Sequence, residues 1–258
     1  MSTTFVEAPS LDDVRAGTAK LETGQQGNAV AHVQLLLGVF DDGRFGRHTS
    51  ETVVAFQQSQ SVSAGEEGKV GSATLAALEA ANAPILNSLS KIDKRNKKIH
   101  LHPAFRRKLA ALADALTGRG MDALITDGFR SFAEQDALFD QGRNKPGDIV
   151  TNSRGGQSNH NYGLAVDVYP VLEGQVLTDK PKGAKKHLAP RFEEIQQAII
   201  AEVEGLGLTS GVHFHNLVDT PHVQLLGENI LNPKASLKIF RDNGNSFDAV
   251  WNEAKRFL

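Results

Sequence analysis

The chain contains 258 residues, of which 40% are hydrophobic and 22% are charged, with a formal net charge of -2. This composition is typical of a soluble globular protein of one or two domains, and it argues against a large basic surface for nucleic acid. Cysteine is absent, which excludes disulfides, cysteine zinc fingers and thiol nucleophiles. The sequence contains no apolar run of ~18 residues for a membrane span, and its first residues lack the pattern of a signal peptide. The nine histidines therefore direct attention to chemistry based on His, Asp, Glu and Arg.

A short internal repeat lies in the N-terminal part of the chain. DGRFGRHT at residues 42–49 and EGKVGSAT at residues 67–74 share the pattern acid-Gly-base-apolar-Gly-x-x-Thr. Each copy predicts a tight turn followed by a helix start, because Gly permits positive φ and Ser or Thr suits a first helical turn. Val30, Val33 and Leu37 predict an earlier helix. We therefore expect a small three-helix domain within residues 1–80.

The rest of the chain divides into a linker and a larger domain. Residues 81–98 contain a proline, small polar residues and a basic run, which predict a linker with at most a short helix. Residues 99–258 mix predicted strands and helices, so we expect an α+β domain with a small antiparallel sheet. The predicted strands are 123–126, 164–169 and 223–226, and the predicted helices are 103–116, 131–139, 192–203 and a terminal helix, 247–258, that docks on the core.

The stretch from Gly155 to Asp167 carries the strongest chemical signal. It passes from a glycine-rich loop into a strand on which Asp167 lies on the face opposite Val166. A carboxylate among apolar residues needs a strong partner, because burying an unpaired charge is costly. His160 comes just before the strand, and Gly163 allows the chain to bend between them. Imidazole and carboxylate converging on one point would supply half of a zinc site.

A second histidine completes this set. Pro221 keeps the chain extended before His222, and the strand that follows is expected to lie beside the Asp167 strand. Three protein ligands would leave the fourth zinc position for water, as in catalytic sites. Asp219 is close enough in sequence to His222 to orient or deprotonate that water. His213 and His215 are alternative ligands, or groups that bind the ligands, although an ordinary hydrogen-bonding role is favoured for both.

Together these motifs resemble the zinc peptidases that include the D-alanyl-D-alanine carboxypeptidases and the phage L-alanyl-D-glutamate endopeptidases. The resemblance covers residues 98–228 and rests on three motifs in order: Asp127-Gly128-Phe129-Arg130-Ser131 with Gln135; Ser158, His160, Gly163, Ala165 and Asp167; and Asp219 with His222. It implies Zn²⁺ bound by His160, Asp167 and His222.

The same resemblance implies roles for the neighbouring residues. Asp219 would be the general base, at a position where other members carry Glu. Arg130 would stabilise the oxyanion, a task suited to a permanently charged guanidinium. Ser158, Gln135 and Tyr162 are candidate substrate-binding residues, with local structural roles as the alternative.

The N-terminal repeat is similar to the peptidoglycan-binding domain of cell-wall hydrolases. Within the matching pattern, Asp42, Phe45, Gly46 and Thr49 are the candidate peptidoglycan-binding residues. The pairing of the two domains resembles phage endolysins. It implies a monomer made in the host cytoplasm without a signal peptide and acting on peptidoglycan, in the periplasm or cell wall, after release.

The sequence leaves the reaction open between three hypotheses. The first is an endopeptidase that cleaves the L-Ala–D-Glu bond of peptidoglycan stem peptides. The second is a D-Ala-D-Ala carboxypeptidase of the same family. The third, of another class, is a non-catalytic cell-wall-binding virion protein.

Overall fold

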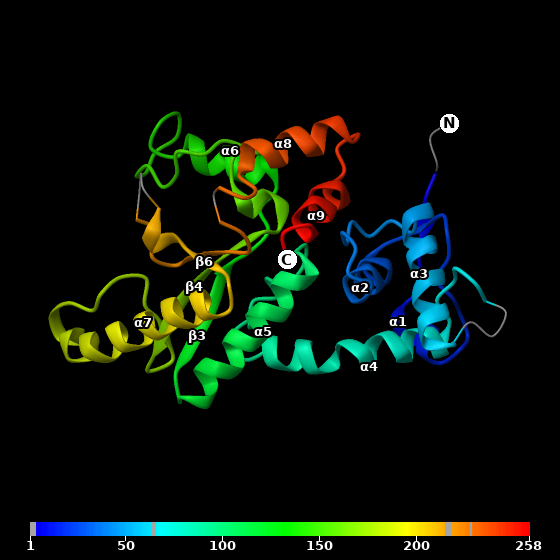
Figure 1. Ribbon diagram of the computed structural model, residues 1–258, viewed down its shortest axis with the longest axis horizontal. Coiled ribbons are helices and arrows are strands. Elements are labelled where there is room, and N and C mark those ends of the chain that lie inside the picture. The colour runs from blue at the N-terminus through cyan, green and yellow to red at the C-terminus, as the bar shows by residue number, and fades with distance from the viewer. Residues whose placement is uncertain (1–3, 63–65, 215–217, 228) are drawn as a thin grey trace. The chain divides into compact units, whose positions relative to one another are not determined.

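The computed structural model describes residues 4–62, 66–214, 218–227 and 229–258 (Figure 1). The chain divides into two compact units, Met1–Leu86 and Asn87–Leu258. Within the described residues, none of the helices combines the length and the apolar character that a membrane span requires.

The first unit contains the predicted helices and a small addition. The elements are β1 (Val6–Glu7), α1 (Leu11–Arg15), β2 (Gln25–Gln26), α2 (Asn28–Leu37), α3 (Arg47–Gln60) and the greater part of α4 (Ser72–Leu89). Helices α2, α3 and α4 correspond to the predicted three-helix arrangement. The short helix α1 and the parallel pairing of β1 with β2 were not predicted.

A buried glutamine explains the first copy of the sequence repeat. Gln34 on α2 is 2% exposed, and its Nε2 donates to Asp42 Oδ1 at 2.9 Å and to the Arg44 carbonyl oxygen at 3.0 Å, with Thr49 Oγ1 also at 3.0 Å. Its Oε1 accepts the N–H of Gly43 at 2.8 Å. The turn is therefore fastened to the preceding helix by a single side-chain amide.

The second copy has the same construction. Gln57 on α3 is fully buried; its Oε1 accepts the N–H of Gly68 at 3.0 Å, and its Nε2 contacts the Lys69 carbonyl oxygen at 2.8 Å and Thr74 Oγ1 at 3.0 Å. The recurring Gly and Thr of the motif are thus the partners of a buried glutamine.

This construction corrects part of the predicted peptidoglycan-binding set. Phe45 is fully buried in the core of the first unit, and Thr49 is 3% exposed and bonded to Gln34. Neither side chain faces solvent, so neither is available to contact a polymer. Asp42 and Gly46 lie at least partly at the surface, and their binding role stays a prediction.

The predicted linker at residues 81–98 was wrong in its structure. Helix α4 continues through Pro84 to Leu89, and Leu89, Ile92 and Asp93 are buried. The Asp93 carboxylate accepts the backbone N–H groups of Lys97 and Lys98, the latter at 2.9 Å. The segment is ordered because its apolar and acidic side chains find partners within the fold.

The second unit is built on a five-stranded antiparallel sheet. Strand order is β3–β4–β7–β6, with β5 paired to β4. The strands are β3 (Asp122–Asp127), β4 (Ala165–Leu172), β5 (Gln175–Val176), β6 (Thr209–Ser210) and β7 (His222–Gln224). Strands β3, β4 and β7 confirm the three predicted strands, whereas β5 and β6 are too short to show a sequence period.

The second unit also contains helices. They are α5 (Pro103–Gly118), α6 (Phe132–Asp140), α7 (Ala189–Gly205), α8 (Pro233–Asp242) and α9 (Phe247–Lys255), with short 3₁₀ helices η1 (Asn159–Tyr162), η2 (Gly183–Leu188) and η3 (Gly211–His213). Helices α5 and α7 contact each other and the strands β3 and β4.

The chain ends in the predicted docked helix, preceded by a helix that was not predicted. In α9, Val250, Trp251 and Ala254 are at most 1% exposed. The Trp251 indole donates to the Tyr162 carbonyl oxygen at 2.8 Å, which connects α9 to η1. Helix α8 packs beside α9 (Figure 1). The terminal helix therefore supports the loop that precedes β4.

Candidate metal centre

Three neighbouring strands align polar side chains in one row across the sheet. Asp127 at the end of β3 pairs with Asp167 on β4, and Asp167 pairs with His222 on β7. An irregularity in the ladder between Ile125 and Asp127 sets the first of these pairings. Paired residues on adjacent strands point to the same face of a sheet. The side chains of Asp127, Asp167 and His222 therefore lie side by side on one face of this sheet.

The third member of the candidate ligand set, His160, reaches this row from a short helix before β4. Ser158 caps η1 by accepting the N–H of His160 at 3.4 Å, and η1 ends at Gly163, whose φ is +64°. A Cβ on Gly163 would overlap the carbonyl oxygen of His100. Only glycine suits this reversal, which carries the chain from His160 into β4 within a few residues.

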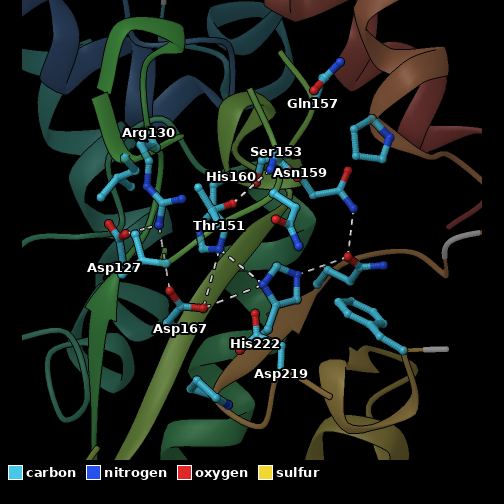
Figure 2. A pocket seen from close by; sticks show the side chains of 18 of the residues that line it. Asp127, Arg130, Thr151, Ser153, Gln157, Asn159, His160, Asp167, Asp219 and His222 are labelled. Atoms are coloured by element: carbon cyan, nitrogen blue, oxygen red, sulfur yellow. Dashed lines mark hydrogen bonds and ion pairs between the residues drawn. The ribbon is translucent and has the colours of Figure 1, made fainter. Parts of the chain in front are cut away.

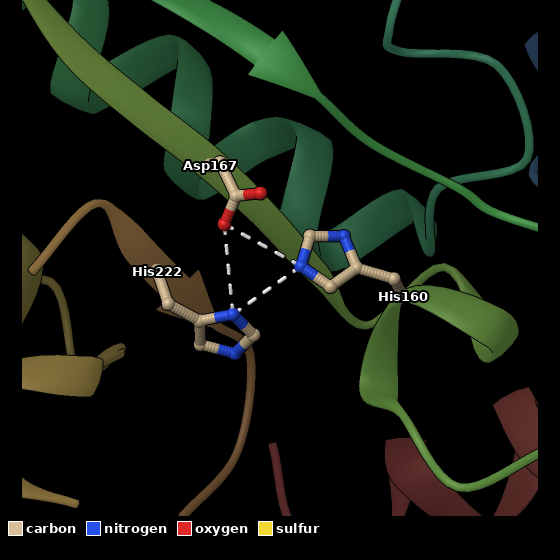
Figure 3. Close-up of side chains that lie close together, drawn as sticks. All are labelled: His160, Asp167 and His222. Atoms are coloured by element: carbon tan, nitrogen blue, oxygen red, sulfur yellow. Dashed lines mark hydrogen bonds and ion pairs between the residues drawn. The ribbon is translucent and has the colours of Figure 1, made fainter. Parts of the chain in front are cut away.

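His160, Asp167 and His222 form a closed triangle of donor atoms (Figure 3). His160 Nε2 lies 3.2 Å from His222 Nδ1 and 3.5 Å from Asp167 Oδ1, and His222 Nδ1 lies 3.7 Å from the same oxygen. The side chains of His160 and His222 are 4% and 9% exposed. The structure therefore brings together all three predicted ligands.

The hydrogen bond on the far side of His160 shows that this donor set suits a cation. Its Nδ1 lies 2.8 Å from the Gly128 carbonyl oxygen, which only accepts, so Nδ1 carries the hydrogen and the Nε2 lone pair faces the triangle. A lone pair directed at a carboxylate and a second imidazole is unfavourable unless a positive charge lies between them. Two nitrogens and one carboxylate oxygen are a catalytic zinc donor set.

Electrostatics at the triangle also favour positive charge. Burial opposes ionisation of Asp167, but the charges and hydrogen bonds of His160 and His222 hold the pKa of this carboxyl well below its ordinary value. Burial disfavours the imidazolium of His222, yet Asp167 raises the pKa of His222 above 6.5. A proton or a metal cation would therefore be held between these groups.

Arg130 lies beside the triangle, next to Asp167. Its guanidinium forms an ion pair with Asp127 and lies 3.9 Å from Asp167 Oδ2 (Figure 2). It also donates to Gln135 Oε1 at 2.8 Å. Gln135 is fully buried and its Nε2 donates to the Ser153 carbonyl oxygen at 2.9 Å. The arginine is thus held in place from two sides while it lines the cleft.

The triangle lies in a cleft of about 610 Å³ that also contains Asp219, Ser158 and Tyr169. Asp219 begins the turn into β7: its N–H donates to the Gly211 carbonyl oxygen at 3.0 Å, and its carbonyl oxygen accepts the N–H of His222 at 3.1 Å. Burial raises the pKa of the Asp219 carboxyl, which makes it a stronger base when ionised.

Two predicted substrate-binding residues have structural roles instead. Tyr162 is fully buried, its hydroxyl donates to the Gly156 carbonyl oxygen at 2.9 Å, and its ring packs against Phe132. Gln135 is also fully buried, where it holds Arg130. Both predictions were wrong because these side chains point into the protein. Ser158 lines the cleft, and its contact with substrate stays a prediction.

Of the two alternative metal ligands, the structure describes His213, which does not join the triangle. His213 is exposed on η3 and its Nε2 lies 2.6 Å from Glu204 Oε1. The alternative ligand role of His213 is therefore not supported by its position. His215 lies outside the described residues.

The sequence reasoning missed functional residues that neighbour the ligands. Asp127 binds Arg130, and Gln224 accepts a hydrogen bond from His222 at 3.1 Å. Both residues could have been found from the sequence. Asp127 is the first residue of the motif that contains Arg130. Gln224 follows His222 by two positions, so the two side chains lie on the same face of the strand. Asn159, beside His160, is a third cleft residue.

Known proteins match parts of the chain. The family profile described as "VanY: D-alanyl-D-alanine carboxypeptidase" matches residues 98–199. The peptidoglycan L-alanyl-D-glutamate endopeptidase CwlK of Bacillus subtilis (strain 168) is 39% identical over 127 residues, which cover 49% of this chain and 74% of that protein. The crystal structure of the Serratia marcescens L-Ala D-Glu endopeptidase ChiX is 21% identical, with a TM-score of 0.33, and the match covers 61% of this chain and 98% of that chain. From the match to CwlK, the chain belongs to the peptidase family represented by the D-alanyl-D-alanine carboxypeptidase VanY and the peptidoglycan L-alanyl-D-glutamate endopeptidase CwlK.

Proposed function

We propose that this protein is a zinc endopeptidase that cleaves the L-Ala–D-Glu bond in the stem peptides of bacterial peptidoglycan. The observation that carries the proposal is the convergence of His160, Asp167 and His222 in one cleft with Asp219 and Arg130. The identity of the bond follows the name of the relative CwlK, which matches over 74% of its length.

Different residues of the cleft would have different roles in hydrolysis. His160, Asp167 and His222 would hold the zinc ion, which when bound polarises a carbonyl and lowers the pKa of a water molecule. Asp219 accepts the proton of the attacking water and delivers it to the leaving amine. Arg130, already charged and fixed by Asp127 and Gln135, stabilises the negative charge that develops on the carbonyl oxygen.

A D-Ala-D-Ala carboxypeptidase is the second candidate, because the matching family profile carries that description. A non-catalytic cell-wall-binding virion protein is a third. It predicts no peptide cleavage, whereas the retained set of Asp219, Arg130 and the triangle supports catalysis.

The direct test of metal-dependent hydrolysis uses the purified full-length protein and isolated peptidoglycan. We expect release of peptide fragments, loss of release after chelation and recovery on addition of zinc. Full zinc occupancy without any cleavage would reject the enzymatic proposal and favour the binding protein.

We further propose that the first unit binds peptidoglycan, as in a phage endolysin that acts as a monomer in the periplasm or cell wall after synthesis in the host cytoplasm. Binding by one unit would raise the effective concentration of the other at an insoluble substrate. Hydrogen exchange on full-length Asp219→Asn with peptidoglycan fragments should show protection within residues 20–80, around Asp42 and Gly46. Protection confined to residues 87–258 would contradict this role.

A further inference from the structure

We infer that Gln224 is a positioning residue that fixes the tautomer of His222, so that its Nδ1 lone pair, and not an N–H, faces Asp167 and His160. This inference deepens the proposed function and rests on it in one respect, the presence of a metal at the triangle. It assigns a role to a buried amide that does not itself reach the donor atoms.

The direction of the hydrogen bonds starts from a backbone carbonyl. Gln224 is 2% exposed, and its side-chain nitrogen lies 2.7 Å from the Leu226 carbonyl oxygen, which can only accept. Gln224 must therefore present its NH₂ group to Leu226. Its Oε1 is consequently directed to the opposite side, where it can only accept.

Two groups donate to that oxygen. Asn159 Nδ2 lies 2.8 Å from Gln224 Oε1, and His222 Nε2 lies 3.1 Å from the same atom. Because Oε1 has no hydrogen to give, His222 Nε2 must carry one, and in the neutral ring Nδ1 is then left with the lone pair.

A reversed amide would break the contacts with Leu226 and Asn159, and its NH₂ would then donate to His222 Nε2 and favour the other tautomer. With the oxygen and nitrogen of Gln224 exchanged, its oxygen would face the Leu226 carbonyl oxygen and its NH₂ would face the NH₂ of Asn159. Leaving buried polar groups unsatisfied is costly, so the observed orientation is strongly preferred. The orientation of one amide thus decides which nitrogen of His222 can bind a metal.

In both histidines a backbone carbonyl oxygen determines which ring nitrogen carries the hydrogen, directly for His160 and through a side chain for His222. The Gly128 carbonyl oxygen acts directly on His160 Nδ1, at 2.8 Å. The Leu226 carbonyl oxygen acts on His222 through Gln224. Both rings consequently direct their free lone pairs at the Asp167 carboxylate, which is the arrangement that a cation requires.

The test measures zinc affinity and the protonated nitrogen of His222, without substrate. Gln224→Met removes the accepting oxygen at similar volume, and we expect zinc affinity to fall about 10–100-fold. In the metal-free variant at alkaline pH, ¹⁵N NMR should show the hydrogen moving from Nε2 towards Nδ1. Gln224→Glu keeps an accepting oxygen opposite His222 Nε2 and should keep the wild-type tautomer, although its second oxygen faces the Leu226 carbonyl oxygen and should lower stability. Wild-type affinity and tautomer in Gln224→Met would overturn the inference.

A second variant keeps the inference testable if Gln224→Met fails to fold. Asn159→Asp replaces the donor to Gln224 with an acceptor and favours the reversed amide, so zinc binding should weaken. A simple effect of added negative charge would strengthen it instead. Equal or tighter zinc binding by Asn159→Asp would therefore contradict the role of Gln224.

A control variant and two separate measurements, zinc binding and peptidoglycan cleavage, allow this inference and the proposed function to be rejected independently. Gln57→Met removes a buried glutamine of the first unit, and zinc affinity should stay at the wild-type value. Wild-type protein that binds zinc with the inferred tautomer but cleaves no peptidoglycan would reject the proposed function alone. Cleavage by the wild type together with an indifferent Gln224→Met would reject the inference alone.

Discussion

Asp167 on β4 and His222 on β7 are directly paired residues of adjacent antiparallel strands, and their facing side-chain atoms are 3.7 Å apart. The sheet therefore fixes the relative position of two of the three donors, while η1 adds His160 from outside the ladder. Metal ligands placed on paired strands are held more rigidly than ligands on loops. Asp219, in the turn before β7, lies on the less regular side of the cleft.

Replacing Asp219, the proposed base, should therefore have different consequences from replacing one of the three metal ligands. Asp219→Asn keeps the shape of the side chain but removes its ability to accept a proton, so kcat should fall about 10²–10⁴-fold. Zinc content should remain that of the wild type, because Asp219 is not one of the three donors. Steady-state kinetics and metal analysis on the same preparations check both statements.

The exposed Asp179 provides the matched control for lost charge. Asp179→Asn should leave kcat within a few-fold of the wild type. A comparable loss in both variants would show that net charge, and not proton transfer at Asp219, limits the reaction.

Gly163 is predicted to be indispensable for the loop that carries His160. Gly163→Ala places a Cβ against the His100 carbonyl oxygen at a positive φ, so the backbone must shift. We expect a loss of more than about 3 kcal/mol in the free energy of unfolding, together with weaker zinc binding. Urea denaturation and zinc titration measure these two effects.

Gly174 provides a control that distinguishes backbone strain at positive φ from steric overlap of the added Cβ. It also has a positive φ, +72°, but no atom lies within 4 Å of its hypothetical Cβ. Gly174→Ala should cost only about 1–2 kcal/mol, the cost of left-handed backbone for a residue with a Cβ, and should bind zinc normally. Similar losses in the two variants would contradict the role assigned to the close approach at Gly163.

His102 makes folding sensitive to acid. It accepts the N–H of Ala104 at the start of α5, and its Nε2 lies 3.3 Å from the Trp251 carbonyl oxygen of α9. Burial lowers the pKa of His102 from 6.5 to about 4. The unfolded chain thus binds a proton more readily than the folded one below pH 6.5, and stability falls as the pH decreases towards about 4.

The expected loss is up to about 3 kcal/mol in the free energy of unfolding, in addition to that of other groups. His102→Gln has no titratable ring and should lose less stability between pH 6.5 and about 4 than the wild type. Urea unfolding curves at several pH values test this difference. Parallel curves for the two proteins would show that His102 does not contribute.

The buried glutamines of the first unit should contribute equally to its stability. Gln34→Leu or Gln57→Leu leaves the N–H of Gly43 or Gly68 without its side-chain acceptor, at a cost of about 1–3 kcal/mol. Gln58→Leu makes the same change at an exposed position of α3 and should stay within about 0.5 kcal/mol of the wild type. Thermal unfolding of the three variants distinguishes buried amides from general helix effects.

Much of the geometry of the candidate metal site was accessible from sequence. Alternation along β4 placed Asp167 on the face away from Val166, and the order of motifs selected His160 and His222 from the nine histidines. The direct pairing of Asp167 with His222 was not predictable, because it depends on the turn before β7.

Polar residues were the principal source of error. Thr49 and Gln135 look available for ligands, and the apolar spacing that includes Gln34 and Gln57 does not reveal which groups their amides bind. The burial of these side chains becomes explicable only when the backbone groups that they satisfy are known. Tertiary hydrogen bonds of this kind have no local sequence period, unlike the apolar stripes of α5 and α7.

The most direct test of the central proposal is mass spectrometry of peptidoglycan digested by the purified full-length protein. The account predicts new fragments with an amino-terminal D-Glu, produced by the wild type with zinc and not by Asp219→Asn. Fragments that have lost only a terminal D-Ala, or peptidoglycan left intact by the zinc-loaded protein, would contradict it.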